Sequence, residues 1–277
     1  MYKRQTWAYN GVYVGMEKIK RDGDRVDIEK IRGDLTGGYI LKVDWPDPDE
    51  WYFTAPNGVD VIVEYPKSDD ITPAQQDWIV SFVEDLHASL PPRTEGSRFA
   101  EYVDPLSFAD FLILRELFKD IDTYRASTYF HKDKTGQLFA GPVWDFNASS
   151  GNGGYLDLAG TAGWMLDAWP DAAAWWRDLL VDDAFRALLL DRWATLRGGL
   201  LSQGSIEAEI DAAAALLGEA ADRNFSRWPV LGVYVWPNAS PMGDTWADEL
   251  QLLRDWLRAR GEWMDEHIEE IGRRTPG

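Results

Sequence analysis

Four oxygen-bearing side chains flank one predicted hairpin, and together they could hold a cation. Asp120 and Asp122 precede the hairpin, and Asp145 and Asn147 follow it. Because a hairpin folds its two flanks toward each other, we expect these side chains to lie close together. Carboxylate and amide oxygens suit magnesium, which keeps several water ligands that phosphate oxygens can replace. The pattern favours a magnesium and phosphate site, but in a chain with 47 acidic residues it also fits solvated turns.

Asp145 carries an additional argument, because it stands between Trp144 and Phe146 at the end of an apolar run. A carboxylate that is buried in such surroundings is costly unless it is paired or bound to a metal. We therefore expect a partner for Asp145. One interpretation is a metal ion, and the other is a helix cap or an ion pair with an arginine such as Arg125.

Other residues give weaker indications of chemistry. Glu17, Lys18 and Lys20 could contact phosphate, although charged runs usually form a solvated face. The three histidines lack the HExxH spacing of zinc hydrolases, and the GxSxG, Walker A and GxGxxG motifs are missing. A group of tryptophans could form a sugar platform, but its helical spacing favours the core; its members are Trp164, Trp169, Trp175 and Trp176.

The elements around the candidate residues follow from local patterns. Residues 104–118 have a strongly apolar helical face, and this predicted helix ends just before Asp120. Residues 128–130 and 138–139, joined by the turn sequence at 133–136, predict the hairpin itself. Its second arm continues directly into Trp144 and Asp145. The sequence thus predicts a helix and a hairpin that together position the acidic side chains.

The rest of the chain changes character near residue 70. Before it we predict a hairpin over residues 7–16, a strand over 39–44 and a second hairpin over 51–54 and 59–65. After it, Thr72 and Pro73 predict the start of a helix. Residues 151–163 predict a glycine-rich loop, and further helices are expected over residues 175–180, 183–196, 205–225 and 245–271. We predict an α+β fold with a β-rich part at 1–70 and a mostly helical part at 71–277.

Composition narrows the function classes. With 277 residues, 45% of them hydrophobic, the chain is long enough for a sizeable core. Its formal net charge of -19 argues against nucleic acid and anionic lipid as partners. The absence of cysteine excludes disulfides, cysteine zinc sites and a thiol nucleophile. We expect no membrane span and see no export signal over residues 1–11.

Four stretches resemble the CotH kinase family, which is named after spore coat protein H. They are NGVYVGMEKIKRDGDRVDIEKI at 10–31, TGGYILKVD at 36–44, EYPKSDDITPAQQDWI at 64–79 and STYFHKDKTGQLFAGPVWDFNASSGN at 127–152. C-terminal segments such as FRALLLDRWATLR, RNFSRWP and WLRARGEWMD are also similar to the family. The resemblance covers nearly the whole chain, and its most specific part is the hairpin followed by Trp144 and Asp145.

This resemblance implies an atypical protein-kinase-like fold, with an N-terminal β-rich part and a helical C-terminal lobe. It also implies an ATP-dependent protein kinase of the Ser/Thr type that uses magnesium. Asp122 matches the acid that orients or deprotonates the acceptor hydroxyl. Asp145 and Asn147 match the metal ligands, and Trp144 and Lys18 are expected at the nucleotide. The expected partner is a protein substrate in the spore coat, in secretions or on the cell surface.

The chain departs from the family pattern in three places. Asn147 stands where the family usually has an aspartate, which keeps an oxygen ligand but removes a charge. Asp120 stands where asparagine is common. An upstream segment with an Arg-Gly-Asn-Ser type motif and a lysine-containing strand would precede Met1, so we expect a chain that lacks the N-terminal part of the family fold. An alternative function is therefore a non-catalytic binding module of the coat or cell surface.

Overall fold

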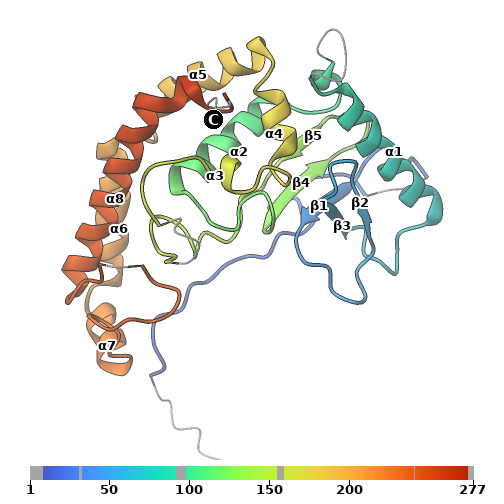
Figure 1. Cartoon of the computed structure of the whole chain (residues 1–277). Helices are drawn as coiled ribbons and strands as arrows, with labels where there is room; N and C mark the ends of the chain where they lie inside the picture. The colour runs from blue at the N-terminus through green and yellow to red at the C-terminus, as the bar shows by residue number, and fades with distance from the viewer. Residues whose placement is uncertain (1–8, 31–32, 92–97, 155–158, 240, 274–277) are drawn as a thin grey trace, which may run out of the picture.

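A computed structural model describes residues 9–30, 33–91, 98–154, 159–239 and 241–273. A β-sheet lies at one side of the molecule, and the long helices α5, α6 and α8 lie at the other (Figure 1). Helix α2 lies between these two regions and contacts β5, α5 and α8. The fold is α+β, as predicted.

The sheet has five antiparallel strands in the order β2-β3-β1-β4-β5. The strands are β1 (Tyr39–Val43), β2 (Tyr52–Thr54), β3 (Asp60–Tyr65), β4 (Thr128–Lys132) and β5 (Leu138–Ala140). The strand at 39–44 and the hairpins at 51–65 and 128–139 were predicted from the sequence, and the structure confirms them. Strand β4 pairs directly with β1, so the sheet joins segments from both sides of residue 70.

The helices occupy most of the chain after residue 72. They are α1 (Pro73–Ser89), η1 (Phe99–Glu101), α2 (Pro105–Phe118), α3 (Met165–Ala168), α4 (Ala174–Leu179), α5 (Asp183–Arg197), α6 (Gln203–Leu217), α7 (Glu219–Arg227), α8 (Trp246–His267) and η2 (Ile268–Glu270). Thr72 caps α1 and Asp104 caps α2, each by accepting a backbone N–H with its side chain. In the described ranges, none of these helices combines the length and apolar character needed to cross a membrane.

The two faces of the sheet bury different clusters. Tyr39, Leu41 and Val43 alternate along β1 toward the main core, and Tyr39 stacks on Trp78 of α1 with ring centroids 5.6 Å apart. Ile40 points to the other face, where a second cluster contains Ile19, Val26, Ile28 and the partly buried Trp144. This second cluster attaches the irregular N-terminal segment to the sheet.

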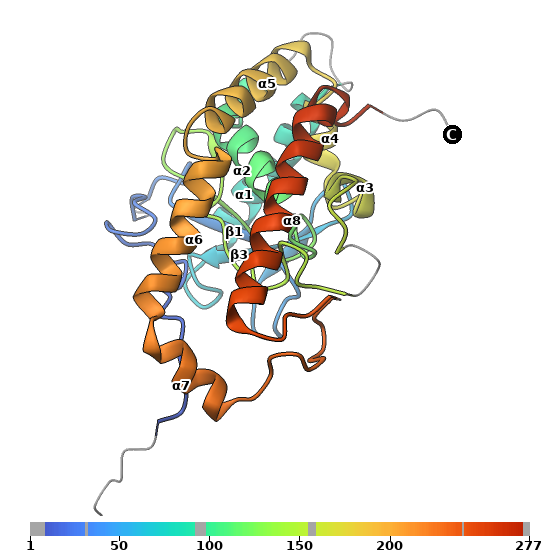
Figure 2. The same cartoon turned by 90° about the vertical axis from the view of Figure 1, so that its left-hand side faces the viewer.

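Two predicted elements are wrong. Of the predicted hairpin at 7–16, residues 7 and 8 lie outside the described residues, and residues 9–16 form no strand. Instead, Trp228 Nε1 donates to Asn10 O and Asn224 Oδ1 accepts from Val12 N, at 2.9 Å each, so long-range contacts override the local turn signal. The predicted helix at 205–225 is broken into α6 and α7 at Gly218, whose φ of 44° leaves the helical region. Figure 2 shows the bend between them.

Candidate functional site

The end of α2 forms the buried centre of the candidate site. Lys119 takes a left-handed conformation with φ of 47°, which ends the helix and turns Asp120 back toward Arg115. Arg115 Nη1 donates to Asp120 Oδ2, and both side chains are fully buried. A buried ion pair at the end of an apolar helix therefore lies directly under the loop that carries Asp122.

Arg115 also joins the two flanks of the β4–β5 hairpin. Its Nη2 donates to Ser127 O at 2.6 Å and to Trp144 O at 2.9 Å. Its guanidinium carbon lies 4.6 Å from the ring centroid of Phe146. One side chain thus binds the segment before β4 and the segment after β5, as expected from the way a hairpin brings its ends together.

Asp122 is positioned on the rim of this centre. Its side chain is 28% exposed and pairs with Arg125, whose Nη2 lies 2.5 Å from Asp122 Oδ1. The guanidinium carbon of Arg125 is 4.3 Å from the ring centroid of Trp169. The carboxylate is therefore oriented by a cation that is itself packed against an aromatic ring, and it stays accessible to solvent.

Asp145 is exposed, so the apolar run that precedes it does not bury the carboxylate. Its φ of 60° places it in the left-handed region, which aspartate tolerates. Trp144 packs against the second cluster, and Phe146 contacts Phe118 edge-on with ring centroids 5.6 Å apart. The rings of Trp144 and Phe146 pack against the protein, and the carboxylate between them faces solvent. Arg125, its suggested partner, pairs with Asp122 instead.

The acidic side chains share one electrostatic environment. Burial raises the pKa of Asp120 to about 7; Arg115 opposes this shift, and the negative charges of Asp122 and Asp145 add to it. Ser127 Oγ donates to Asp145 Oδ2 at 3.5 Å, which links the two flanks a second time. Negative charge from both flanks therefore acts on one buried carboxylate.

The remaining predicted residues lie around this rim. Asn147 is exposed, and its backbone carbonyl oxygen accepts a hydrogen bond from Asn152 Nδ2 at 3.0 Å. Lys18 is exposed and precedes Ile19, which belongs to the second cluster together with Trp144. Trp144 and Ile19, the chain neighbour of Lys18, thus lie on the same face of the sheet. Lys20 forms an ion pair with Glu17 at 2.8 Å on the surface.

The side-chain oxygens around the site determine how a metal ion could be held there. Within the described residues, no group of three or more His, Asp or Glu side chains is placed to hold a metal ion. Magnesium at phosphates commonly uses one or two protein carboxylates and completes its shell with water and phosphate oxygens. The exposed oxygens of Asp145 and Asn147 fit that mode of binding, and they do not fit a cation held by protein ligands alone.

Two features of the site were not found from the sequence. Arg115 and Ser127 hold the flanks together, but nothing in their spacing marks them. The adjacent charges Arg115 and Glu116 inside the apolar run of α2 are the available signal, because buried charges require partners.

The tryptophans are core residues, as the sequence favoured: Trp175 and Trp176 are buried, and Trp164 and Trp169 pack against the core.

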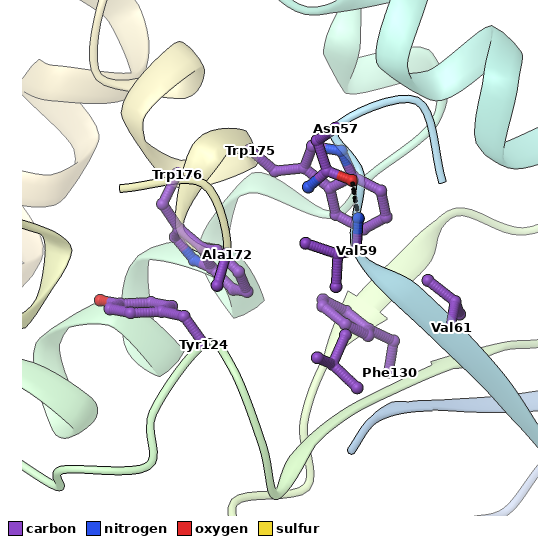
Figure 3. Close-up of a pocket in the computed structure, with 9 residues that line it drawn as sticks. Asn57, Val59, Val61, Tyr124, Phe130, Ala172, Trp175 and Trp176 are labelled. Carbon is purple, nitrogen blue, oxygen red and sulfur yellow. Dashed lines mark hydrogen bonds between the residues drawn. The ribbon is translucent and has the colours of Figure 1, made fainter. Parts of the chain in front are cut away.

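A small cavity lies between the sheet and α4 (Figure 3). Its volume is about 10 Å³, and apolar side chains such as Val59, Phe130 and Trp175 line it. The side chain of Asn57 accepts from Val59 N at 3.4 Å, which is the dashed line in Figure 3. This volume is close to that of one water-sized probe, so the cavity is a packing defect in the core and holds no substrate.

A larger groove begins at Asn147, and its volume is about 820 Å³. The loop after β5 forms one wall, and the segment after α7 together with the first turns of α8 forms the other. The lining residues are Phe146, Asn147, Ser149, Ser150, Gly151, Asn152, Ala159, Gly160, Phe225, Val230, Leu231, Asn238, Ala239, Pro241, Met242, Trp246, Glu249, Leu250, Leu252, Leu253 and Trp256. This size is in the usual range of ligand sites.

Comparison with known proteins gives one match. The family model described as CotH kinase protein matches residues 1–264 of the 277. The match includes the complete sheet, the candidate site and nearly all of α8. Searches of curated proteins and of solved structures found nothing that matches this chain.

Proposed function

Because the chain belongs to the CotH kinase family, and is therefore a kinase-like protein, we propose that it transfers the γ-phosphoryl group of ATP to protein hydroxyls with magnesium. The acceptor side chains are serine or threonine, and the acceptor is a protein of the spore coat or cell surface. One observation carries the proposal. Arg115 binds carbonyl groups on both flanks of the hairpin and pairs with Asp120, and the charges of Asp122 and Asp145 both act on this buried carboxylate.

Asp122 is the acceptor-orienting residue in this proposal. Its carboxylate accepts the proton of the acceptor hydroxyl as the hydroxyl oxygen bonds to the γ-phosphorus. The bond between the γ-phosphorus and the bridging oxygen breaks, and ADP leaves with the electron pair. Arg125 keeps the carboxylate in position through its ion pair. In phosphoryl transfer, such positioning and charge stabilisation supply most of the catalysis.

Asp145 and Asn147 are the metal-binding residues. Magnesium held there would neutralise charge on the phosphates of the nucleotide. Because the amide of Asn147 is neutral, Asp145 supplies the charge of this pair. Ser127 Oγ, at 3.5 Å from Asp145 Oδ2, orients the carboxylate. Trp144 and Lys18 contact the nucleotide from the face of the sheet on which the second cluster lies.

Calorimetric titration with ATP and magnesium tests the binding step. We expect saturable heat for the unaltered chain, no heat when magnesium is replaced by EDTA, and at least a tenfold weaker affinity for Asp145→Ala. Asp77→Ala, which removes an exposed carboxylate on α1, is the matched control and should bind as the unaltered chain does. Equal affinities for the two variants would remove Asp145 from the site, and an unaltered chain that gives no heat would refute the kinase proposal.

A binding module without catalysis is the second candidate. It is favoured by the exposed apolar side chains of the segment after α7, which include Tyr234 at 58% and Trp236 at 72% exposure. Such a cluster is typical of contact surfaces. The two functions differ in one measurement, because only a kinase transfers labelled phosphate to an acceptor protein in a reaction that depends on Asp122.

A further inference from the structure

Hydrogen bonds join the walls of the groove that begins at Asn147. Trp256 Nε1 donates to Ala159 O at 2.7 Å, and Gly154 N donates to Pro237 O at 2.6 Å. Gly151 has φ of 81°, and a Cβ added there would lie 2.6 Å from the Trp256 ring. The loop after β5 is therefore fastened both to α8 and to the segment after α7. Figure 2 shows α8 and this segment on the same side of the molecule.

The chemistry of the groove selects one kind of occupant. The described lining contains no lysine or arginine, and its single acid, Glu249, already accepts from Gly243 N at 2.8 Å. A nucleotide requires cations or a metal at its phosphates, and beyond Asn147 at one end the described lining supplies neither, so the length of the groove is unsuited to a nucleotide. Apolar side chains such as Leu250 and Leu253 of α8 lie in the same groove as amides and hydroxyls of the loop after β5. That mixture fits a polypeptide segment, which offers apolar side chains together with backbone hydrogen-bonding groups.

The position of the groove relative to the metal-binding residues gives the second argument. Trp144 packs against the second cluster, whereas Phe146 and Asn147 line the groove. The segment 144–147 thus separates the face expected for the nucleotide from the groove. In phosphoryl transfer the attacking and leaving oxygens are roughly in line, on opposite sides of the transferred group. An acceptor that approaches through the groove meets this requirement.

We propose that the groove binds an extended segment of the acceptor protein and selects an aliphatic or aromatic side chain near the phosphorylated residue. The apolar side chain enters the part that Met242, Leu250 and Leu253 line, and the serine or threonine hydroxyl lies at the Asn147 end, next to the segment that carries Asp145. This inference rests on the proposed function and adds to it a specificity-determining surface. The transferred phosphoryl group, the proton and ADP follow the steps given above.

A positional-scanning library of serine peptides tests the selectivity. Each sub-library fixes one residue at one position on either side of the serine, and incorporation of labelled phosphate is measured with magnesium and ATP. We expect one position at which leucine, methionine or phenylalanine gives at least tenfold more incorporation than serine or aspartate. Incorporation that is equal for all residues at every position would overturn the inference.

Substitutions in the groove test where the selected side chain binds. Leu250→Gln and Met242→Gln should each raise KM for the best peptide about tenfold and leave KM for ATP unchanged. Two variants are used so that a folding defect in one does not decide the result. Leu216→Gln is the matched control, because Leu216 is 87% exposed on α6 and does not line the groove.

The outcomes distinguish this inference from the function on which it rests. Phosphate transfer with unchanged peptide KM in both groove variants would overturn the groove as the acceptor site and leave the kinase proposal in place. If peptide KM is unchanged, and the chain self-associates in a way that Leu250→Gln abolishes, the groove binds a second copy of the chain instead. A chain that binds ATP with magnesium and transfers phosphate to no peptide would overturn the proposed function, and this inference with it.

Discussion

Arg115 and Glu116 are adjacent on α2, and each forms a fully buried ion pair that holds a different region of the molecule. Arg115 pairs with Asp120 and binds the two flanks of the β4–β5 hairpin. Glu116 pairs with Arg260 of α8 at 3.4 Å and accepts from Met165 N and Leu166 N at 2.8 and 3.0 Å. Arg260 also donates to the carbonyls of Thr161 and Gly163.

The two pairs differ in the charges around them. Burial raises the pKa of Glu116, and all its neighbours oppose this shift by hydrogen bonds or by positive charge. Burial also raises the pKa of Asp120, but there the charges of Asp122 and Asp145 add to the shift. Among the described residues, Arg115 Nε has no hydrogen-bond partner. The charge of Glu116 is therefore balanced by its own neighbours. The Arg115 network instead carries excess negative charge, which a bound cation would balance.

Asp122→Asn should have the largest effect, and it acts on activity. The amide keeps the size of the side chain but accepts no proton, so kcat for phosphate transfer should fall by about 10² to 10⁴. Because Asp122 is on the rim and its pair with Arg125 is partly exposed, the free energy of unfolding should change by less than about 1 kcal/mol. Initial rates with a serine peptide and urea unfolding measure the two effects.

Asp77→Asn on α1 is the control for that substitution and should leave both quantities unchanged. Unchanged kcat in Asp122→Asn would assign the acceptor-orienting role elsewhere. A large loss of stability in that variant would show that the rim and the buried pair are one structural unit, and the contrast between the two networks would then fail.

Arg260→Met should have the next largest effect, and it acts on stability. The substitution leaves Glu116 buried without its cation, which costs about 3–5 kcal/mol. Arg115→Met should cost a similar amount, because Asp120 loses its partner in the same way. The two variants should differ in function. Folded Arg260→Met should bind ATP with magnesium as the unaltered chain does, and folded Arg115→Met should bind it at least tenfold more weakly.

Urea unfolding and calorimetric titration at a temperature where both variants are folded measure these differences. The double variant Glu116→Gln, Arg260→Met separates the pair from its surroundings, since removing both charges should cost less than the sum of the single substitutions. Additive costs would contradict a direct pairing. Equal losses of nucleotide affinity in Arg115→Met and Arg260→Met would remove the functional distinction between the two regions.

The sequence predicts most of the elements and the general place of the site. Thr72 and Asp104 mark helix starts through local hydrogen bonds, which neighbouring residues determine. The hairpin that precedes Trp144 is local for the same reason. The exposure of Asp145 could not be predicted from the sequence, because it depends on which rings pack against distant residues such as Ile19. Arg115 and Arg260 were missed, since besides one carboxylate each they bind backbone carbonyl groups, which any residue supplies.

Asp120→Asn gives the smallest and most specific prediction, because it concerns pH. Burial and the neighbouring acids raise the pKa of Asp120 in the folded chain to about 7, from its ordinary value of 3.8. Between these values the folded state binds more protons than the unfolded state, so the free energy of unfolding falls as pH rises. In Asp120→Asn this contribution is absent. The free energy of unfolding of the unaltered chain minus that of the variant should therefore fall from pH 4 to pH 7, by at most about 1.4 kcal/mol per pH unit. Urea unfolding of both proteins at several pH values measures this difference in the free energy of unfolding.

A difference that is constant, or that grows with pH, would mean that Arg115 outweighs burial and the neighbouring acids. The charge of Asp120 would then be balanced within its own network, as the charge of Glu116 is.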